Sequence, residues 1–168
     1  GKTLAGALAK QGKKVAVVEK SDKMYGGTCI NVGCIPTKSL VRSAQLSKLA
    51  GGSFEEKSAR YLAAVGEKRR LTAMLRGKNY EKLDLAGVTI INGEASFTGP
   101  RSGSVQGQDG TMELSAEQVF INTGAETVIP PIRGIEGNPF VYASDSIMEL
   151  EKLPERLVII GGGYIGLE

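Results

Sequence analysis

The chain has 168 residues, 41% of them hydrophobic, and its 21 Lys and Arg against 18 Asp and Glu leave a net charge of +3. Such a balance, with only 5% aromatic residues, gives little reason to expect a nucleic-acid-binding protein. No apolar run approaches the roughly 18 residues that span a bilayer. With 23 glycines, the composition is ordinary for an α/β domain rich in phosphate-binding turns, and we expect it in the cytoplasm.

The N-terminal segment predicts part of a dinucleotide-binding fold. Apolar residues at helical spacing predict a helix over 4–9 that ends at Gly12, and the β-branched run 15–19 predicts a parallel strand. We interpret the segment as the second half of a βαβ unit, with Gly1 belonging to its glycine motif and the first strand preceding it. Glu19 then ends the strand where an acid meets a ribose hydroxyl. The alternative for Glu19 is an ordinary exposed strand-end acid.

The next feature is a pair of cysteines, Cys29 and Cys34, which are the only ones in the chain. A disulfide needs Cα atoms roughly 4.4–6.8 Å apart, whereas five residues of straight helix rise by about 7.5 Å. The segment must therefore be bent, and Asn31 and Gly33 are best suited to unusual backbone angles. The pair predicts a disulfide that opens and closes, and hence electron transfer.

The residues after the pair predict that the two sulfurs differ. Pro36 suits the first turn of a helix, which would place Cys34 at the N-terminus, where the helix dipole favours a thiolate. Lys38 adds a positive charge one turn later. Cys29 would then be freer to attack a substrate. The alternatives are a static disulfide, which a short loop stabilises little, two inert buried thiols, and a zinc site, for which two cysteines without histidine are half the ligands.

The middle of the chain predicts two helices and a small antiparallel sheet. Apolar spacing indicates a helix over 37–50 that ends at Gly51-Gly52, and a basic helix over 55–76 whose Lys and Arg residues we interpret as a solvated face. Short strands follow over 88–93, 95–97, 104–106, 111–114 and 118–122, with turns at 99–100 and 108–110. Residues 130–131 and 134–139 predict an extended connector.

The C-terminal segment predicts a second dinucleotide-binding motif. The apolar run 157–160 predicts a buried strand. It is followed by an intact G-x-G-x-x-G motif, formed by Gly161, Gly163 and Gly166, and then by the predicted start of a helix. This context makes the motif specific for a pyrophosphate at a helix N-terminus. Two dinucleotide folds flanking a cysteine pair predict two different dinucleotides.

The runs GGTCINVGCIPTK, FINTGAETVIPPIRGI and LVIIGGGYIGLE resemble the class I pyridine nucleotide–disulfide oxidoreductases. These are FAD flavoproteins that include dihydrolipoamide dehydrogenase, glutathione reductase and mercuric reductase. Within the family, Met24-Tyr25, Thr37 and the run that starts at Phe120 look most like the bacterial reactive-chlorine-resistance flavoproteins, which act as hypothiocyanous acid reductases. The resemblance covers nearly the whole chain.

The resemblance implies a role for each matching residue. Cys34 would be the flavin-side thiolate, Cys29 the interchange thiol, and Lys38 would lie at the flavin edge and pair with Glu168. The other expected cofactor-binding residues would contact FAD or NAD(P)H, and they are Gly1, Glu19, Gly27, Thr28, Ala95, Thr123 and Gly124 for FAD and Gly161, Gly163, Tyr164 and Gly166 for NAD(P)H. For Ala95, Tyr164 and Glu168 the alternatives are a plain strand residue, a packing aromatic and a surface acid.

The implied fold is a doubly wound, Rossmann-like FAD-binding domain with a small β-meander insertion, truncated at both ends. We expect residues 1–152 to belong to that domain and 153–168 to begin an NAD(P)-binding domain, so the chain would be a fragment, inactive by itself. The whole protein would be a homodimer that passes electrons from NAD(P)H through FAD and the cysteine pair to an oxidised sulfur acceptor, without a metal. Dihydrolipoamide dehydrogenase, a mercuric or glutathione-type reductase, and a flavin-binding fragment without activity stay open as alternatives.

Overall fold

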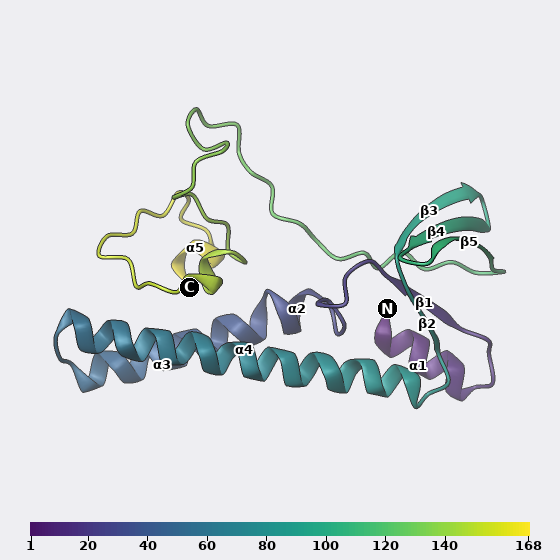
Figure 1. Ribbon diagram of the computed structural model, residues 1–168, viewed down its shortest axis with the longest axis horizontal. Helices are drawn as coiled ribbons and strands as arrows, with labels where there is room; N and C mark the ends of the chain where they lie inside the picture. The colour runs from purple at the N-terminus through teal and green to yellow at the C-terminus, as the bar shows by residue number, and fades with distance from the viewer. The chain divides into compact units, whose positions relative to one another are not determined.

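The computed structural model describes residues 1–168 and divides into two compact units. The first unit holds residues 1–27 and 74–124, and the second holds residues 28–73 and 125–168. Helix α4 (Phe54–Asp84) runs through the division, so each unit contains one part of it (Figure 1). No helix in the structure is both long and apolar enough to cross a membrane.

The first unit begins with helix α1 (Lys2–Lys10), for which Gly1 is the N-cap, followed by strand β1 (Ala16–Glu19). The chain turns between them at Gly12, where φ is +79°, a conformation that glycine adopts without steric cost. Strand β1 pairs in parallel with β2 (Thr89–Asn92), so that Glu19 and Asn92 lie side by side at the carboxyl edge. The predicted helix and parallel strand are both confirmed.

A separate antiparallel sheet follows, made of β3 (Glu94–Gly99), β4 (Ser102–Gly107) and β5 (Gly110–Ser115) in that spatial order. Its short turns lie at the predicted glycine and proline positions, and Gly110 has φ of +119°. Figure 1 shows the three strands as a compact meander beyond β2. The mixed α/β architecture with a meander insertion is therefore confirmed.

The core of the first unit joins α1, the end of α4 and the parallel strands around Tyr25. Ala5, Tyr25, Leu83 and Val88 form the buried cluster, with half-buried apolar residues of β1 and β2 packed against it. The Tyr25 ring meets Tyr80 edge-on, with centroids 4.9 Å apart, and its hydroxyl donates to Asn92 Oδ1. Tyr25 thereby fixes the segment that leads into the cysteine motif.

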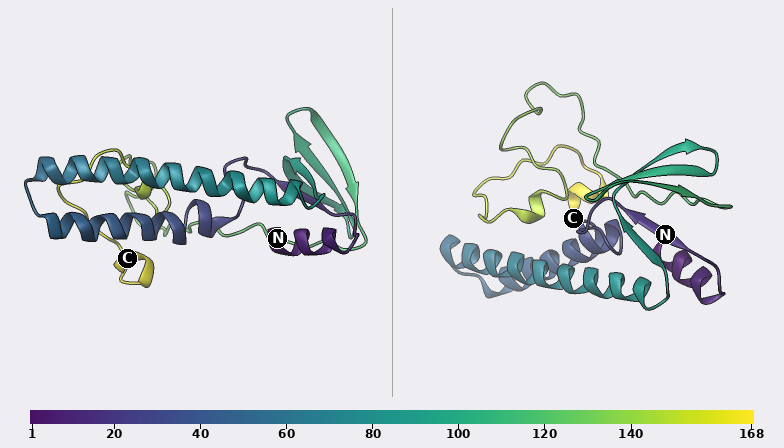
Figure 2. Two further views of the ribbon diagram at one scale, coloured as in Figure 1. Left: turned by 90° about the horizontal axis from the view of Figure 1, so that it is seen from below. Right: turned by 45° about the vertical axis from the view of Figure 1, so that its right-hand side comes forward.

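The second unit contains helices α2 (Thr28–Asn31), α3 (Cys34–Ala50), the first half of α4, the 3-10 helix η1 (Ile147–Glu149) and α5 (Tyr164–Leu167). Helix α3 ends at Gly51, with φ of +65°, and Figures 1 and 2 show it beside the first half of α4 as a hairpin. Arg60 closes the hairpin because its Nε donates to Ser47 Oγ at 2.9 Å and its guanidinium also donates to the Gly51 carbonyl.

One basic residue of α4 contradicts the prediction of a solvated face. The Lys68 side chain is only 1% exposed and pairs with Glu149 of η1. Its neighbour Arg69 donates to Glu149 Oε2 at 2.8 Å and to Glu151 Oε1 at 3.0 Å. A buried ammonium is tolerated only when it is paired, so these contacts bind η1 to α4.

The structure also differs from the predicted elements in four other places. Helix α4 continues to Asp84, about two turns further than residue 76. Residues 118–122 and 157–160 are irregular rather than strands. The connector predicted over 130–131 and 134–139 contains turns at 133–137 and 139–140 rather than extended chain throughout. A strand exists only when a neighbouring strand accepts its backbone hydrogen bonds. In this structure those two apolar runs have no such neighbour, and Ile121 and Val158 are 71% and 86% exposed.

Two leucines near the end of α4 test the core of the first unit. Leu83 is 3% exposed and belongs to the buried cluster, whereas Leu85 is 79% exposed. We expect Leu83→Ala to lower the free energy of unfolding by about 2–5 kcal/mol, because it leaves a cavity. Leu85→Ala should change it by less than about 0.5 kcal/mol. Urea denaturation of the chain followed by circular dichroism measures both, and equal effects would contradict this core.

Candidate active site

The cysteine pair lies where two helices of the second unit meet. Cys29 is the second residue of α2, Gly33 is the N-cap of α3, and Cys34 is the first residue of α3. Pro36 lies in the first turn of α3 and is buried. Cys34 therefore occupies the predicted helix N-terminus. Both cysteines are free thiols with exposed side chains, so the pair is open to reagents.

Gly33 allows the first turn of α3 to approach the first residues of α2. A Cβ at this position would lie 3.1 Å from the Thr28 carbonyl oxygen, which is tighter than most Cβ contacts, and 3.4 Å from Cys29 Cα. Close packing thus favours glycine at this position. The prediction of unusual angles holds for Gly33, with φ of −127° and ψ of −115°, but not for Asn31, which is a buried helical residue. The bend lies in one residue rather than two.

The two sulfurs interact directly. The side-chain hydrogen bond with Cys34 raises the pKa of the Cys29 thiol above its ordinary value, and burial and the charge of Cys34 raise it further. Hydrogen bonds from the backbone N–H groups of Cys34 and Ile35 lower the pKa of Cys29 in part. Because a free N–H at a helix start stabilises negative charge, these amides offer the Cys29 sulfur a partner as a thiolate.

Lys38 and Glu168 form an ion pair, as the resemblance implied. Lys38 lies one turn into α3, and its Nζ contacts Glu168 Oε1 next to α5. The Lys38 side chain is 71% exposed, so the pair adds at most about 1 kcal/mol to stability. The catalytic roles of both residues stay predictions.

The glycine motif near the C-terminus is packed tightly around Gly161. Gly161 has φ of +107°, Gly163 is the N-cap of α5, and a Cβ at Gly166 would lie 2.7 Å from the Gly161 carbonyl oxygen. Tyr164 opens α5 and is 83% exposed. The motif thus forms the predicted turn and helical opening, although no strand precedes it.

The residues expected at FAD are spread over both units. In the first unit Glu19 ends β1, where its Oε1 accepts a hydrogen bond from the Ser21 N–H at 3.1 Å, and Ala95 lies exposed on β3. Gly27 has φ of +85°. In the second unit Thr28 is the first residue of α2.

The segment that carries the remaining two expected residues passes beside the start of α1. A Cβ at Gly1 would lie 3.5 Å from Asn122 Cβ, immediately before Thr123 and Gly124. Both residues are exposed, and Gly124 has φ of +83°. The structure therefore brings Gly1 and the end of the 118–122 run together within the first unit.

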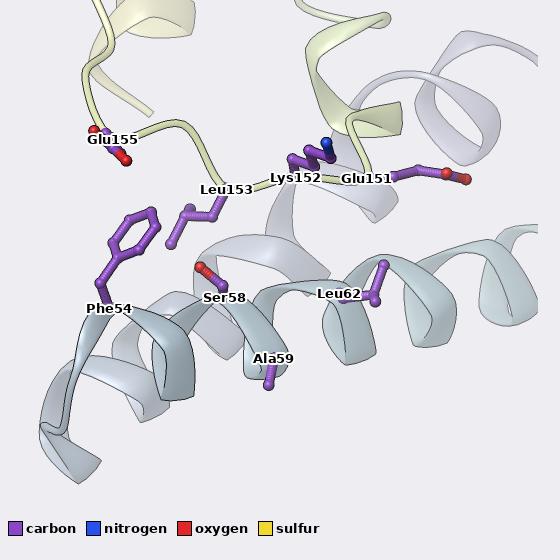
Figure 3. A pocket seen from close by; sticks show the side chains of 8 residues that line it. All are labelled: Phe54, Ser58, Ala59, Leu62, Glu151, Lys152, Leu153 and Glu155. Carbon is purple, nitrogen blue, oxygen red and sulfur yellow. The ribbon is translucent and has the colours of Figure 1, made fainter.

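A groove of about 440 Å³ lies elsewhere in the second unit, between the first turns of α4 and residues 151–155 (Figure 3). Phe54 and Leu153 face each other across it, and Leu62 lies further along the helix. Its lining contains no thiol and no hydroxyl other than Ser58. The chemistry of the chain therefore centres on the exposed cysteine pair and not on this groove.

Sequence reasoning missed the residues that support the cysteine turn. The Thr37 hydroxyl lies 2.7 Å from the Gly33 carbonyl oxygen and 3.4 Å from Met148 Sδ, and η1 is in turn held by Lys68. The contact between Thr37 and Met148 joins residues far apart in the chain, which no local pattern indicates.

The hydrogen bond between the sulfurs predicts a change in Cys29 reactivity. Replacing Cys34 with Ala removes the largest cause that raises the pKa of Cys29. We therefore expect the Cys34→Ala variant to titrate at lower pH and Cys29 to react faster with iodoacetamide at pH 7. Alkylation rates between pH 6 and 10, read by mass spectrometry, measure this. Ser43→Ala, further along α3, serves as a control without effect, and an unchanged or raised pKa of Cys29 in Cys34→Ala would contradict the assignment.

Comparison with known proteins agrees with this geometry. A family model for pyridine nucleotide-disulphide oxidoreductases matches residues 1–168. The chain is 46% identical over 169 residues to the probable pyridine nucleotide-disulfide oxidoreductase RclA of Escherichia coli K12, covering 100% of this chain and 36% of that protein. A mercuric reductase of Lysinibacillus sphaericus is 34% identical over 94% of this chain and 29% of its own length.

A solved structure extends the likeness to three dimensions. The Cu(II) complex of the HOCl-induced flavoprotein disulfide reductase RclA from Escherichia coli superposes with a TM-score of 0.89 and 45% identity, covering 99% of this chain and 36% of that one. The chain thus spans about a third of the length of the relatives it matches. On the sequence match and the shared fold together, the chain belongs to the pyridine nucleotide-disulphide oxidoreductase family.

Proposed function

We propose that this chain is the FAD-binding part of an NAD(P)H-dependent flavoprotein disulfide oxidoreductase that reduces an oxidised sulfur compound, with hypothiocyanous acid as the acceptor. The observation that carries the proposal is the pair of exposed free thiols, Cys29 in α2 and Cys34 at the start of α3, whose interaction raises the pKa of Cys29. We assign residues 1–152 to the FAD-binding domain and 153–168 to the start of the NAD(P)-binding domain. The setting we propose is the cytoplasm, where thiol pairs stay available for catalysis.

Local geometry supports FAD as the cofactor. Gly26 and Gly27 have φ of +98° and +85°, and their backbone, which carries no Cβ, permits the close approach that a pyrophosphate requires. Glu19 presents a carboxylate at the carboxyl end of β1, the position at which this fold accepts ribose hydroxyls. FAD, when bound, would supply the electron pair that opens the Cys29–Cys34 disulfide. We assign NAD(P)H to the Gly161–Gly166 turn.

The thiols themselves can carry out the reduction of the acceptor. The Cys29 thiolate attacks the sulfur of hypothiocyanous acid, the S–O bond breaks, and the leaving hydroxide takes a proton to become water. Cys34 then attacks Cys29 as a thiolate, which forms the disulfide and releases thiocyanate. The acceptor gains two electrons and the dithiol loses two. Cys29 is the attacking residue in this scheme because Cys34 is the first residue of α3 and is placed to resolve the adduct.

Single-turnover chemistry in the full-length protein tests the roles of the cysteines. Pre-reduced wild type should consume one equivalent of hypothiocyanous acid per cysteine pair and end as an intramolecular disulfide. Cys34→Ser should also consume one equivalent but retain a thiocyanate adduct on Cys29, and Cys29→Ser should lose turnover by more than about a hundredfold while keeping bound flavin. The flavin spectrum and thermal melting control for folding. Turnover of Cys29→Ser at the wild-type rate would overturn the assignment.

The choice of acceptor is tested by comparing substrates. The full-length protein should oxidise NADH or NADPH faster with hypothiocyanous acid than with oxidised lipoamide, glutathione disulfide or Hg(II), each at the same concentration. The higher identity to RclA, 46% against 34% to the mercuric reductase, supports an acceptor other than Hg(II). A preference for lipoamide or Hg(II) would keep the cysteine chemistry and replace the acceptor.

A further inference from the structure

The hydroxyl of Thr37 donates to the peptide carbonyl before Cys34. Its oxygen lies 2.7 Å from the Gly33 carbonyl oxygen, which also accepts the Thr37 backbone N–H at 3.1 Å. Pro36, the preceding residue, has no N–H to offer. The Gly33 carbonyl is thus held from two directions by one residue.

The peptide unit between Gly33 and Cys34 transmits this contact to the thiols. In a trans peptide the C=O and N–H groups point in opposite directions on one rigid plane. Fixing the Gly33 carbonyl along α3 therefore fixes the Cys34 N–H in the other direction, toward α2. A hydrogen bond from that N–H, together with one from the N–H of Ile35, lowers the pKa of the Cys29 thiol. The Thr37 hydroxyl and the Cys29 sulfur are coupled through one peptide plane.

A second acceptor competes for the Thr37 proton. Met148 Sδ lies 3.4 Å from Thr37 Oγ1, its side chain is buried, and a thioether can only accept. A hydroxyl carries a single proton, so it bonds the carbonyl, bonds the sulfur or divides between them. Met148 belongs to η1, which Lys68 and Arg69 hold on α4 through Glu149. The position of Met148 beside α3 is therefore fixed by the structure around it.

We propose that Thr37 is a positioning residue for the redox pair: its hydroxyl orients the Gly33–Cys34 peptide so that the amide of Cys34 faces the Cys29 sulfur, and Met148 of η1 moderates this by sharing the proton. The inference rests on the proposed function for its importance to turnover, because Cys29 is the attacking thiol there. The orientation itself depends only on the contacts of the second unit.

Alkylation of Cys29 in the reduced 168-residue chain tests the coupling without flavin or acceptor. Thr37→Val keeps the shape and removes the hydroxyl, so Cys29 should lose amide stabilisation and react with iodoacetamide at pH 7 at least about threefold more slowly, with its pH profile moved to higher pH. Thr37→Ser should stay within about twofold of wild type. Met148→Leu, which removes the competing sulfur, should not slow the reaction.

A matched control separates this effect from the general loss of a helix hydroxyl. Thr72→Val removes a similar bond, from Thr72 Oγ1 to the Arg69 carbonyl at 3.1 Å, on α4. It should leave the pH profile of Cys29 unchanged. If Thr37→Val does not fold, Thr37→Ala provides the same loss of the hydroxyl in a good helix former.

The contradicting results are equally specific. A wild-type pH profile in the folded Thr37→Val or Thr37→Ala variant, or a loss in Thr37→Ser as large as in Thr37→Val, would overturn the role of the hydroxyl. Slower alkylation in Met148→Leu would overturn the competition. The alkylation assay uses only the thiols and does not depend on the acceptor. If it gives the expected result while the full-length protein does not reduce hypothiocyanous acid, the proposed function alone would be wrong.

Discussion

The close approach of two backbone turns at Gly33 is the constraint on which the candidate site depends. With only a hydrogen in place of a side chain, Gly33 lets the Thr28 carbonyl and Cys29 Cα lie against the start of α3, where a Cβ would crowd the Thr28 carbonyl oxygen. This contact places the two sulfurs within hydrogen-bonding reach and aims the first amides of α3 at Cys29. Without it, Cys29 and Cys34 would belong to separate helices with no reason to share a proton or a bond.

The surrounding helices hold this turn in place through side chains that are distant in the chain. The pair between buried Lys68 and Glu149 fixes η1 on α4, and η1 in turn brings Met148 to Thr37. Such a pair contributes little net stability, but removing Glu149 would leave the buried ammonium of Lys68 without its partner. The role of the Lys68–Glu149 pair is therefore to hold η1, and with it Met148, beside the first turn of α3.

Local patterns in the sequence were enough to predict much of this arrangement. Glycine, proline and the helical stripe after Cys34 indicate a bent segment that feeds a helix, and the structure has both. The parallel strand that ends at Glu19 and the meander after Asn92 follow from β-branched runs between turn residues. These elements depend on residues near one another in the chain, which is why they could be predicted.

What could not be predicted depends on contacts between distant residues. Lys68 has the same local context as the exposed basic residues around it, and only the position of Glu149 shows that it is buried. The pattern of the apolar runs 118–122 and 157–160 predicts strands. A strand needs a neighbouring strand to pair with, and neither run has one in this structure. The chain spans about a third of its relatives' length, so the roles of Glu19, Ala95, Thr123, Gly124 and Tyr164 toward a cofactor stay predictions.

The central claim is that Cys29 and Cys34 act as one reversible couple, and a redox titration of the reduced chain tests it most directly. Equilibration in glutathione buffers of graded ratio, followed by acid quenching and mass spectrometry, counts the free thiols and identifies their linkage. The account predicts that both thiols disappear together in one transition, giving a disulfide within a single chain that reductant reopens fully. Independent loss of the two thiols, or disulfides formed only between chains, would contradict it.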